Sequence, residues 1–123
     1  SCPAYATSSG KALLSGLDAA EVRTRLGGGL EAFTDTTVTS LSQLHNELAS
    51  VRDRGWASVT EELEVGLNAV AAPVRDVHSQ VVAALSVSGP TYRLGVDRFE
   101  EVAKLTIAAA DEISRRLGWI SRD

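Results

Sequence analysis

The feature that most constrains the fold is the stretch from Val81 to Pro90, VVAALSVSGP, which is the longest apolar run in the chain. Turn-forming residues flank it on both sides. Because strand side chains alternate between two faces, one face is aliphatic and the other carries small residues ending in Ser86 and Ser88. A strand that is apolar on both faces is normally covered on both. We therefore expect this stretch to be a buried strand around which the domain is organised.

The two serines allow two interpretations. A hydroxyl on a covered face needs a hydrogen-bonding partner, since burying it without one costs free energy. Ser86 and Ser88 either bond to neighbouring backbone groups or point into a pocket that holds a small polar ligand. The strand taken alone favours the backbone interpretation.

Length and charge limit the class of protein. The chain has 123 residues, enough for one domain with one core. Its net charge is −4 and its pI is about 5.1, unlike the clustered basic surface of a nucleic-acid-binding domain. No apolar run reaches the ~18 residues of a membrane helix, and no signal peptide is evident. We expect a cytoplasmic domain without membrane contact.

Periodicity and capping residues predict a mixture of helices and strands. Capping-box pairs occur at Asp18–Glu21, Ser40–Gln43 and Asp97–Glu100. Residues 67–74 and 81–89 form a predicted antiparallel hairpin, with a further strand in 56–62. The predicted helices begin at Ser8 and at the three capping boxes. The last of them should bury one side, made of Phe99, Val102, Thr106, Ala109, Ile113 and Leu117.

The predicted elements are unbalanced. The sequence predicts three strands and three or four helices. Strands that are apolar on both faces need more neighbouring elements than these residues provide. We infer that further strands lie upstream of Ser1 or come from a partner chain. The absence of any methionine agrees with a processed chain or a piece of a longer one.

No catalytic or metal-binding constellation is evident. The two histidines are far apart in different predicted elements, and no base accompanies Ser8 or Ser9 as a nucleophile. Glu61, Glu62 and Glu64 are interpreted as a solvated acidic turn in preference to a metal site. We expect no enzyme activity, no metal and no cofactor. Free amides at the helix start near Ser8 form at most a weak anion site by themselves.

Three segments resemble a known family. PAYATSSGKALL at 3–14, ELEVGLNAVAAPVRD at 62–76 and VVAALSVSGPTYRL at 81–94 are similar to the effector-binding domain of IclR-type bacterial transcriptional regulators. RDRGW at 52–56 and DEISRRLG at 111–118 agree in order and spacing. The combination is specific, although no single motif is.

The resemblance implies an α+β, GAF-like fold with a mostly antiparallel sheet flanked by helices. Residues 1–123 would then be the C-terminal part of the effector-binding domain, with its first strands missing. A winged helix-turn-helix that binds DNA would lie upstream. The resemblance also implies a homodimer or homotetramer and a small organic or aromatic acid as the effector.

The resemblance further implies which residues bind the effector. Its carboxylate would lie on the backbone amides of Ser8, Ser9 and Gly10, and the hydroxyls of Ser86 and Ser88 would line the same pocket. The helix start and the serine face of the strand thus indicate one cavity. With the resemblance added, the pocket interpretation of the two serines becomes the favoured one.

This sequence departs from the family at three positions. Some members have an acidic residue in place of Val59 and a cysteine in place of Ala69, so this pocket should be less polar and suit a larger or more apolar acid. Ser79 stands where the family often has glycine, which puts the geometry of that turn in doubt.

The leading hypothesis is therefore a ligand-sensing regulatory domain. An oligomerisation module whose pocket is empty or filled by side chains is the main alternative. A hydrolase that uses Ser8 or Ser9 is a remote third possibility.

Overall fold

The computed structural model describes residues 6–26, 30 and 34–120. The elements follow one another in the order α1 (Ser8–Leu14), α2 (Ala19–Leu26), α3 (Leu41–Arg54), β1 (Ala57–Thr60), β2 (Leu67–Arg75), β3 (Val81–Pro90), the 3₁₀ turn η2 (Val96–Arg98) and α4 (Phe99–Arg116). The expected α+β class is confirmed. A glycine triplet at 27–29, which is typical of a linker, lies outside the described residues.

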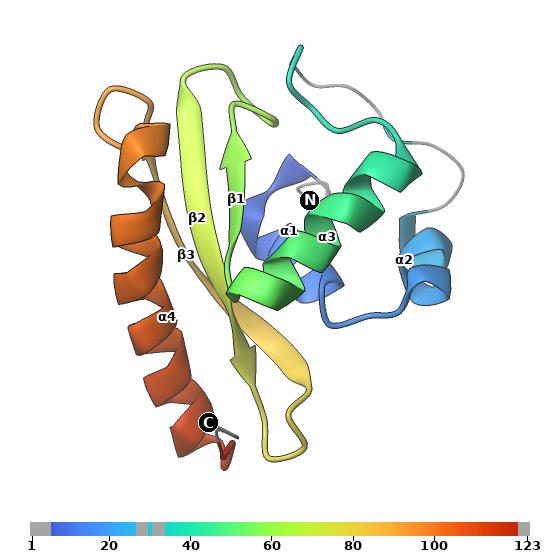
Figure 1. The fold of residues 1–123 in the computed structure, drawn as a ribbon, viewed down its shortest axis with the longest axis vertical. Coiled ribbons are helices and arrows are strands. Elements are labelled where there is room, and N and C mark those ends of the chain that lie inside the picture. Colours follow the sequence, from blue (N-terminus) through green and yellow to red (C-terminus); the bar gives the residue numbers. More distant parts are fainter. Residues whose placement is uncertain (1–5, 27–29, 31–33, 121–123) are drawn as a thin grey trace.

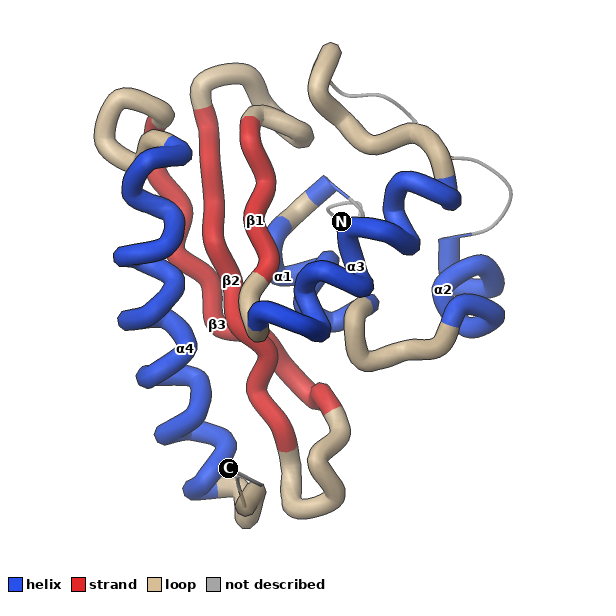
Figure 2. The backbone as a smooth tube through the Cα atoms, viewed as in Figure 1, coloured by secondary structure: helices blue, strands red, loops and turns tan. Residues whose placement is uncertain are grey.

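The strands form an antiparallel sheet in the order β1-β2-β3. The predicted hairpin is confirmed, because Leu67 pairs with Pro90 and Val74 with Ala83. Helix α4 lies along one face of the sheet, and α1 and α3 lie on the other (Figure 1). The tube in Figure 2 shows the same layers, with the sheet between the long last helix and the three earlier helices.

The best-covered strand is β2, not β3. Residues Asn68 to Val74 of β2 are all buried, since helices cover both faces and strands flank both edges. In β3, by contrast, Val82, Ser86, Val87 and Ser88 are exposed, because the strand lies at the edge of the sheet. The expectation that β3 is buried on both faces is therefore wrong for the described residues.

The alternation of β3 is nevertheless as predicted. Leu85 packs with Ala72 and Ala110 on the side of α4, and Ala84 packs with Ala12 and Ala71 on the side of α1. Since Ser86 and Ser88 are two and four residues from Ala84, they share its face toward α1. The sequence pattern thus assigned the faces correctly and misjudged how far they are covered.

Side-chain caps fix the starts of three helices. Thr7 Oγ1 accepts a hydrogen bond from the Gly10 amide, Asp18 Oδ1 accepts one from the Glu21 amide, and Ser40 Oγ accepts one from the Gln43 amide. The third predicted capping box is wrong. Residues Val96–Arg98 form a 3₁₀ turn, and α4 begins after Arg98 without a side-chain cap.

Helix α4 faces the sheet with a side that shares Phe99 and Thr106 with the predicted one and is otherwise different. Its buried residues are Phe99, Ala103, Thr106, Ala110 and Ser114. Of the expected set, Ile113 and Leu117 are 41% and 48% exposed. Small side chains such as Ala103 and Ala110 allow the helix to lie close to β2. Close packing against the strand, and not hydrophobicity alone, therefore determined which side of α4 is buried.

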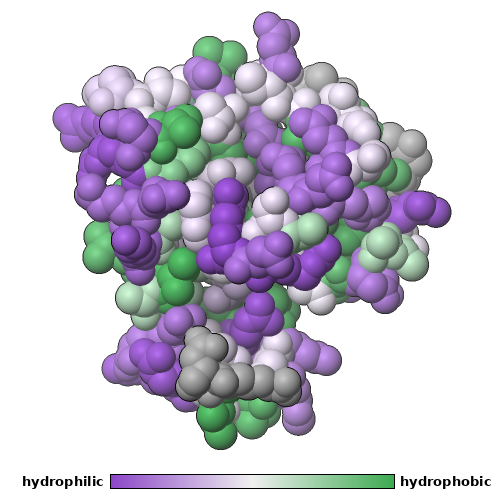
Figure 3. Space-filling view, in the orientation of Figure 1, coloured by the Kyte–Doolittle hydropathy of each residue, from purple (hydrophilic) through white to green (hydrophobic). Residues whose placement is uncertain are grey.

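The surface seen with α3 in front is largely polar. Hydrophilic side chains cover most of the middle of this face, and hydrophobic groups are scattered near its edges (Figure 3). None of the helices within the described ranges is long and apolar enough to cross a membrane.

The hairpin turn between β2 and β3 is held by Asp76. Its Oδ1 atom accepts hydrogen bonds from the amides of His78 and Gln80 at 2.8 and 3.1 Å. Ser79 lies at φ = 62°, in the left-handed region that favours glycine. The turn is thus formed with serine in a conformation that disfavours a side chain.

We predict that Ser79→Gly stabilises the chain. Glycine removes the cost of the left-handed conformation at this position, and its greater freedom in the unfolded chain offsets part of that gain. The free energy of unfolding should therefore rise by about 0.5–1 kcal/mol. Urea unfolding measures the difference. Glu61→Gly is the control, because Glu61 also has a positive φ of 54° but its Oε1 accepts the Gly66 amide. That variant should gain less or lose stability, and no gain at Ser79 would contradict the strain assignment.

Candidate functional site

A cavity of about 150 Å³ lies between the N-terminal end of α1 and the sheet. Strand pairing places Val59, Ala69 and Ser88 in one row across the three strands. Neighbouring strands are about 4.8 Å apart, so this row spans roughly 10 Å. All three residues line the cavity. The volume is below the ~300–1,000 Å³ typical of pockets for drug-sized ligands, which indicates a smaller molecule.

One end of the cavity is formed by the first turn of α1. Thr7, Ser8 and Ser9 line it. The Gly10 amide is already bonded to Thr7 Oγ1, and the Lys11 amide to the Thr7 carbonyl oxygen. The amides of Ser8 and Ser9 precede them in the helix, where no intrahelical acceptor exists. These two amides are the backbone donors that the helix leaves for an anion.

The hydroxyls on β3 form the second polar group of the cavity. Ser86 and Ser88 both line it, and the structure gives their hydroxyls no hydrogen bond to any residue in the described part of the chain. The alternative that they bond to neighbouring backbone is therefore not observed. Their exposure leaves them accessible to a ligand.

The structure brings five of the six predicted ligand-binding residues to one cavity. Ser8, Ser9, Ala69, Ser86 and Ser88 all line it. The sixth, Gly10, instead lines a neighbouring hollow between α1, α2 and β3. Its amide serves the helix cap, so Gly10 has no direct place in the cavity.

The remaining wall is apolar with one acidic side chain. Val59, Leu63, Leu67 and Ala69 supply the apolar surface, and Glu64 is the charged residue of the lining. The low polarity expected from Val59 and Ala69 therefore agrees with the wall that the structure shows. Nothing in the sequence indicated that Glu64 would line this cavity.

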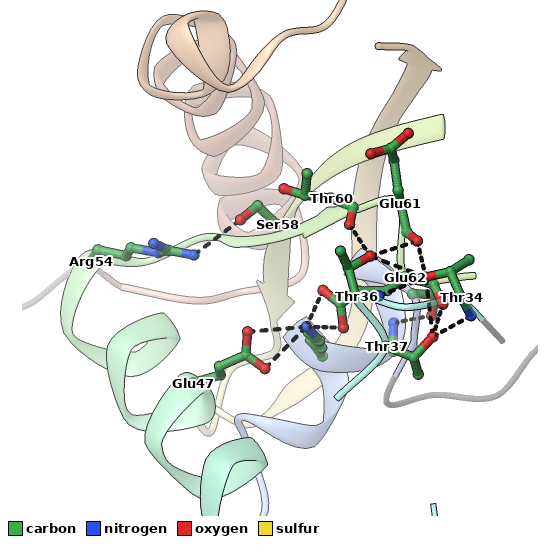
Figure 4. A network of polar contacts seen from close by, with 12 residues as sticks. Thr34, Thr36, Thr37, Glu47, Arg54, Ser58, Thr60, Glu61 and Glu62 are labelled. Atoms are coloured by element: carbon green, nitrogen blue, oxygen red, sulfur yellow. Dashed lines mark hydrogen bonds and ion pairs between the residues drawn. The ribbon is translucent and has the colours of Figure 1, made fainter. Parts of the chain in front are cut away.

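A buried ion pair joins two of the segments that line the cavity. Lys11, on α1, is 1% exposed, and its Nζ atom lies 2.7 Å from Glu62 Oε2 and 3.2 Å from Glu47 Oε2. Glu62 is itself 5% exposed. The prediction of a solvated acidic turn is therefore wrong for Glu62. The three charges join α1, α3 and the loop that follows β1 (Figure 4).

The segment before α3 is bound to the same loop. Thr36 Oγ1 donates to the carbonyl oxygens of Thr60 and Glu61, both at 2.8 Å. The hydroxyls of Thr34 and Thr37 donate to the carbonyl oxygens of Glu61 and Glu62. Figure 4 shows the three threonines gathered at this backbone. The threonines of this segment therefore anchor the loop that lines the cavity.

Burial controls the ionisation of Glu62. Desolvation raises the pKa of this carboxyl above its ordinary value of 4.5, because it outweighs the hydrogen bond and the charge of Lys11. The second carboxylate, Glu47, adds to the rise. At the surface the opposite occurs, where hydrogen bonds from Arg115 and Arg116 lower the pKa of Glu112.

We predict opposite pH dependences at these two glutamates. The raised pKa means that the folded state holds the Glu62 proton more tightly than the unfolded chain. Its contribution to stability is thus complete below pH 4.5 and is lost as the pH rises through the raised value. The free energy of unfolding of the parent, relative to Glu62→Gln, should therefore fall as the pH rises above 4.5.

Glu112→Gln provides the control. The lowered pKa of Glu112 gives a contribution that is present above the ordinary value and lost as the pH falls, so the parent should gain relative to this variant with rising pH. Chemical unfolding from pH 4 to 7 measures both slopes. A rising slope for Glu62 would show that Lys11 outweighs burial.

Comparison with known proteins agrees with the fold. The sequence profile "Bacterial transcriptional regulator IclR C-terminal" matches residues 1–115. The acetate operon repressor of Salmonella typhimurium is 39% identical over 117 residues, which are 94% of this chain and 43% of that protein. The chain thus spans less than half the length of the curated relatives that it matches.

Solved structures give the same result. The repressor BlcR of Agobacterium tumefaciens superposes with a TM-score of 0.90 at 28% identity, covering 98% of this chain and 48% of that one. A double mutant of the inducer-binding domain of PobR from Acinetobacter, in complex with 3-hydroxybenzoic acid, gives 0.82 at 34% identity, covering 92% and 66%. These relatives are transcriptional regulators, not enzymes. The chain belongs to the IclR family of bacterial transcriptional regulators and corresponds to their C-terminal domain.

Proposed function

We propose that this domain binds a small organic or aromatic acid in the cavity between α1 and the sheet. The observation that carries the proposal is the convergence of two helix-start amides, at Ser8 and Ser9, with the hydroxyls of Ser86 and Ser88, which have no hydrogen-bond partner among the described residues. All four groups can donate hydrogen bonds to one carboxylate. The apolar wall at Val59, Leu67 and Ala69 would receive the rest of the ligand.

The comparison with PobR supports this class of ligand. Its inducer-binding domain is bound to 3-hydroxybenzoic acid, a small aromatic acid. In the full-length protein, ligand binding would alter the DNA affinity of an upstream winged helix-turn-helix domain. We place this regulator in the cytoplasm and expect it to act as a homodimer or homotetramer.

The binding proposal predicts a separation of affinity from stability. Ser86→Ala with Ser88→Ala removes two donors to a charged acceptor, each worth about 1.5–3 kcal/mol, so even one lost bond weakens binding roughly 10-fold to 100-fold. Stability should hardly change, because neither hydroxyl bonds to the described part of the protein. Calorimetric titration with 3-hydroxybenzoate or another acid found by thermal shift, beside a melting curve, measures both.

Ser42→Ala with Ser50→Ala is the matched control, because these serines are exposed on α3 and do not line the cavity. It should leave both affinity and melting temperature unchanged. If the β3 double variant keeps its affinity for an acid that the parent binds, the pocket assignment is wrong. If it melts earlier and binds normally, the hydroxyls are structural.

The alternative function is an oligomerisation module without a ligand, and one observation favours it. The exposed strand β3 presents Val82 and Val87, which are 51% and 43% exposed, at the edge of the sheet. Open edges of this kind favour pairing with another strand or chain. A domain of this type would associate with itself whether or not an acid binds.

We predict that the chain self-associates. Sedimentation equilibrium should give a mass that is a multiple of 13.0 kDa. Val82→Lys with Val87→Lys adds charge to the open strand and should shift the mass toward the monomer. A monomer for the parent at every concentration would count against this role of the edge. Association with no response to any acid in thermal shift would favour the alternative function.

A further inference from the structure

The loop from Glu61 to Gly66 forms the wall of the cavity beyond β1. It begins two residues after Val59, at the opposite edge of the sheet from Ser88. Leu63 and Glu64 both line the cavity from this loop. Glu64 therefore lines the cavity from a different segment than the serine hydroxyls, which line it from β3.

Several contacts hold the loop in place. Glu61 Oε1 accepts the Gly66 amide at 2.8 Å, and the Glu61 amide donates to the Leu67 carbonyl oxygen at 3.0 Å. The buried Lys11 holds Glu62, and Thr36 binds the backbone at Glu61. A loop anchored at so many points presents Glu64 from a fixed backbone position.

The charge of Glu64 is the one left uncompensated in this acidic loop. Glu61 is hydrogen-bonded to the loop backbone and Glu62 is paired with Lys11. Glu64 is exposed, and its carboxylate has no ion pair or hydrogen bond with any residue of the described ranges. The described lining contains no lysine, arginine or histidine that could offset it.

We infer that Glu64 determines specificity, and that the cavity selects acids with one carboxylate and a hydrogen-bond donor, a hydroxyl or an amino group, at the far end. This inference rests on the proposed function, which places the ligand carboxylate at Ser8, Ser9, Ser86 and Ser88. A carboxylate at Glu64 accepts a hydrogen bond from a hydroxyl or an ammonium group. A second ligand carboxylate would meet a like charge there, and discrimination of this kind is achieved by repulsion.

A matched set of acids tests the inference. 3-Hydroxybenzoate and isophthalate differ only in the second substituent on the same ring. 3-Hydroxypropionate and succinate, which differ by the same replacement of a hydroxyl by a carboxylate, form the aliphatic counterpart. The parent should bind the hydroxy acid of at least one pair about tenfold more tightly than the diacid, as expected for one partly screened charge repulsion. Calorimetric titration at low ionic strength measures each affinity.

Glu64→Gln should raise the affinity for the diacid about tenfold and change that for the hydroxy acid by less than about threefold, because a glutamine oxygen still accepts a hydrogen bond. The preference of the parent should also shrink when salt is added, since an exposed charge is screened. Glu100→Gln is the control, because it removes one exposed carboxylate on α4, behind the sheet. It should leave the preference unchanged.

The outcomes separate the two proposals. If the parent binds a hydroxy acid but Glu64→Gln leaves its preference over the diacid unaltered, the role of Glu64 is overturned and the proposed function stands. If Glu100→Gln changes the preference as much as Glu64→Gln does, the effect is one of net charge and the role is again overturned. If none of the four acids binds, both the role of Glu64 and the proposed function are overturned for these ligands.

Discussion

The buried contact between Lys11 and Glu62 is the interaction on which the site depends. Burying an ammonium group is costly without close partners, and Lys11, which is 1% exposed, has Glu62 and Glu47 at 2.7 and 3.2 Å. Removing one member of such a pair leaves a buried charge, at a cost of about 3–5 kcal/mol. The pair therefore holds α1 against the loop that follows β1, and both segments line the cavity.

The sheet explains why the cavity lies where it does. Strand β2 is covered on both faces, so it provides the rigid centre against which α1 and α4 pack. The first turn of α1 lines the same cavity as the row formed by Val59, Ala69 and Ser88. The small side chain of Ala69 leaves space at the middle of this row. The same order, β1-β2-β3, leaves β3 at an edge. Binding groups on β3 are consequently reachable from solvent.

Local rules predicted the parts of the site that lie within one element. Alternation along β3 placed Ser86 and Ser88 on a common face, and the cap at Thr7 set where the free amides of α1 begin. The same rules misplaced Gly10, because its amide is used by that cap. They also missed the buried ion pair of Lys11 and the position of Glu64 at the cavity, which depend on how segments distant in the sequence pack together. A charged residue near an apolar run gives no local sign of its partner.

The sequence by itself determined the fold class, the hairpin, most helix starts and the shared face of the two serines, because periodicity and capping act over a few residues. Only the tertiary structure decided that β2 is the covered strand, that α4 packs through Ala103 and Ala110, and that Glu62 is buried. Whether a residue is buried depends on which other segments pack against it. Those neighbours are determined by how whole helices and strands pack together, and no local pattern in the sequence predicts that.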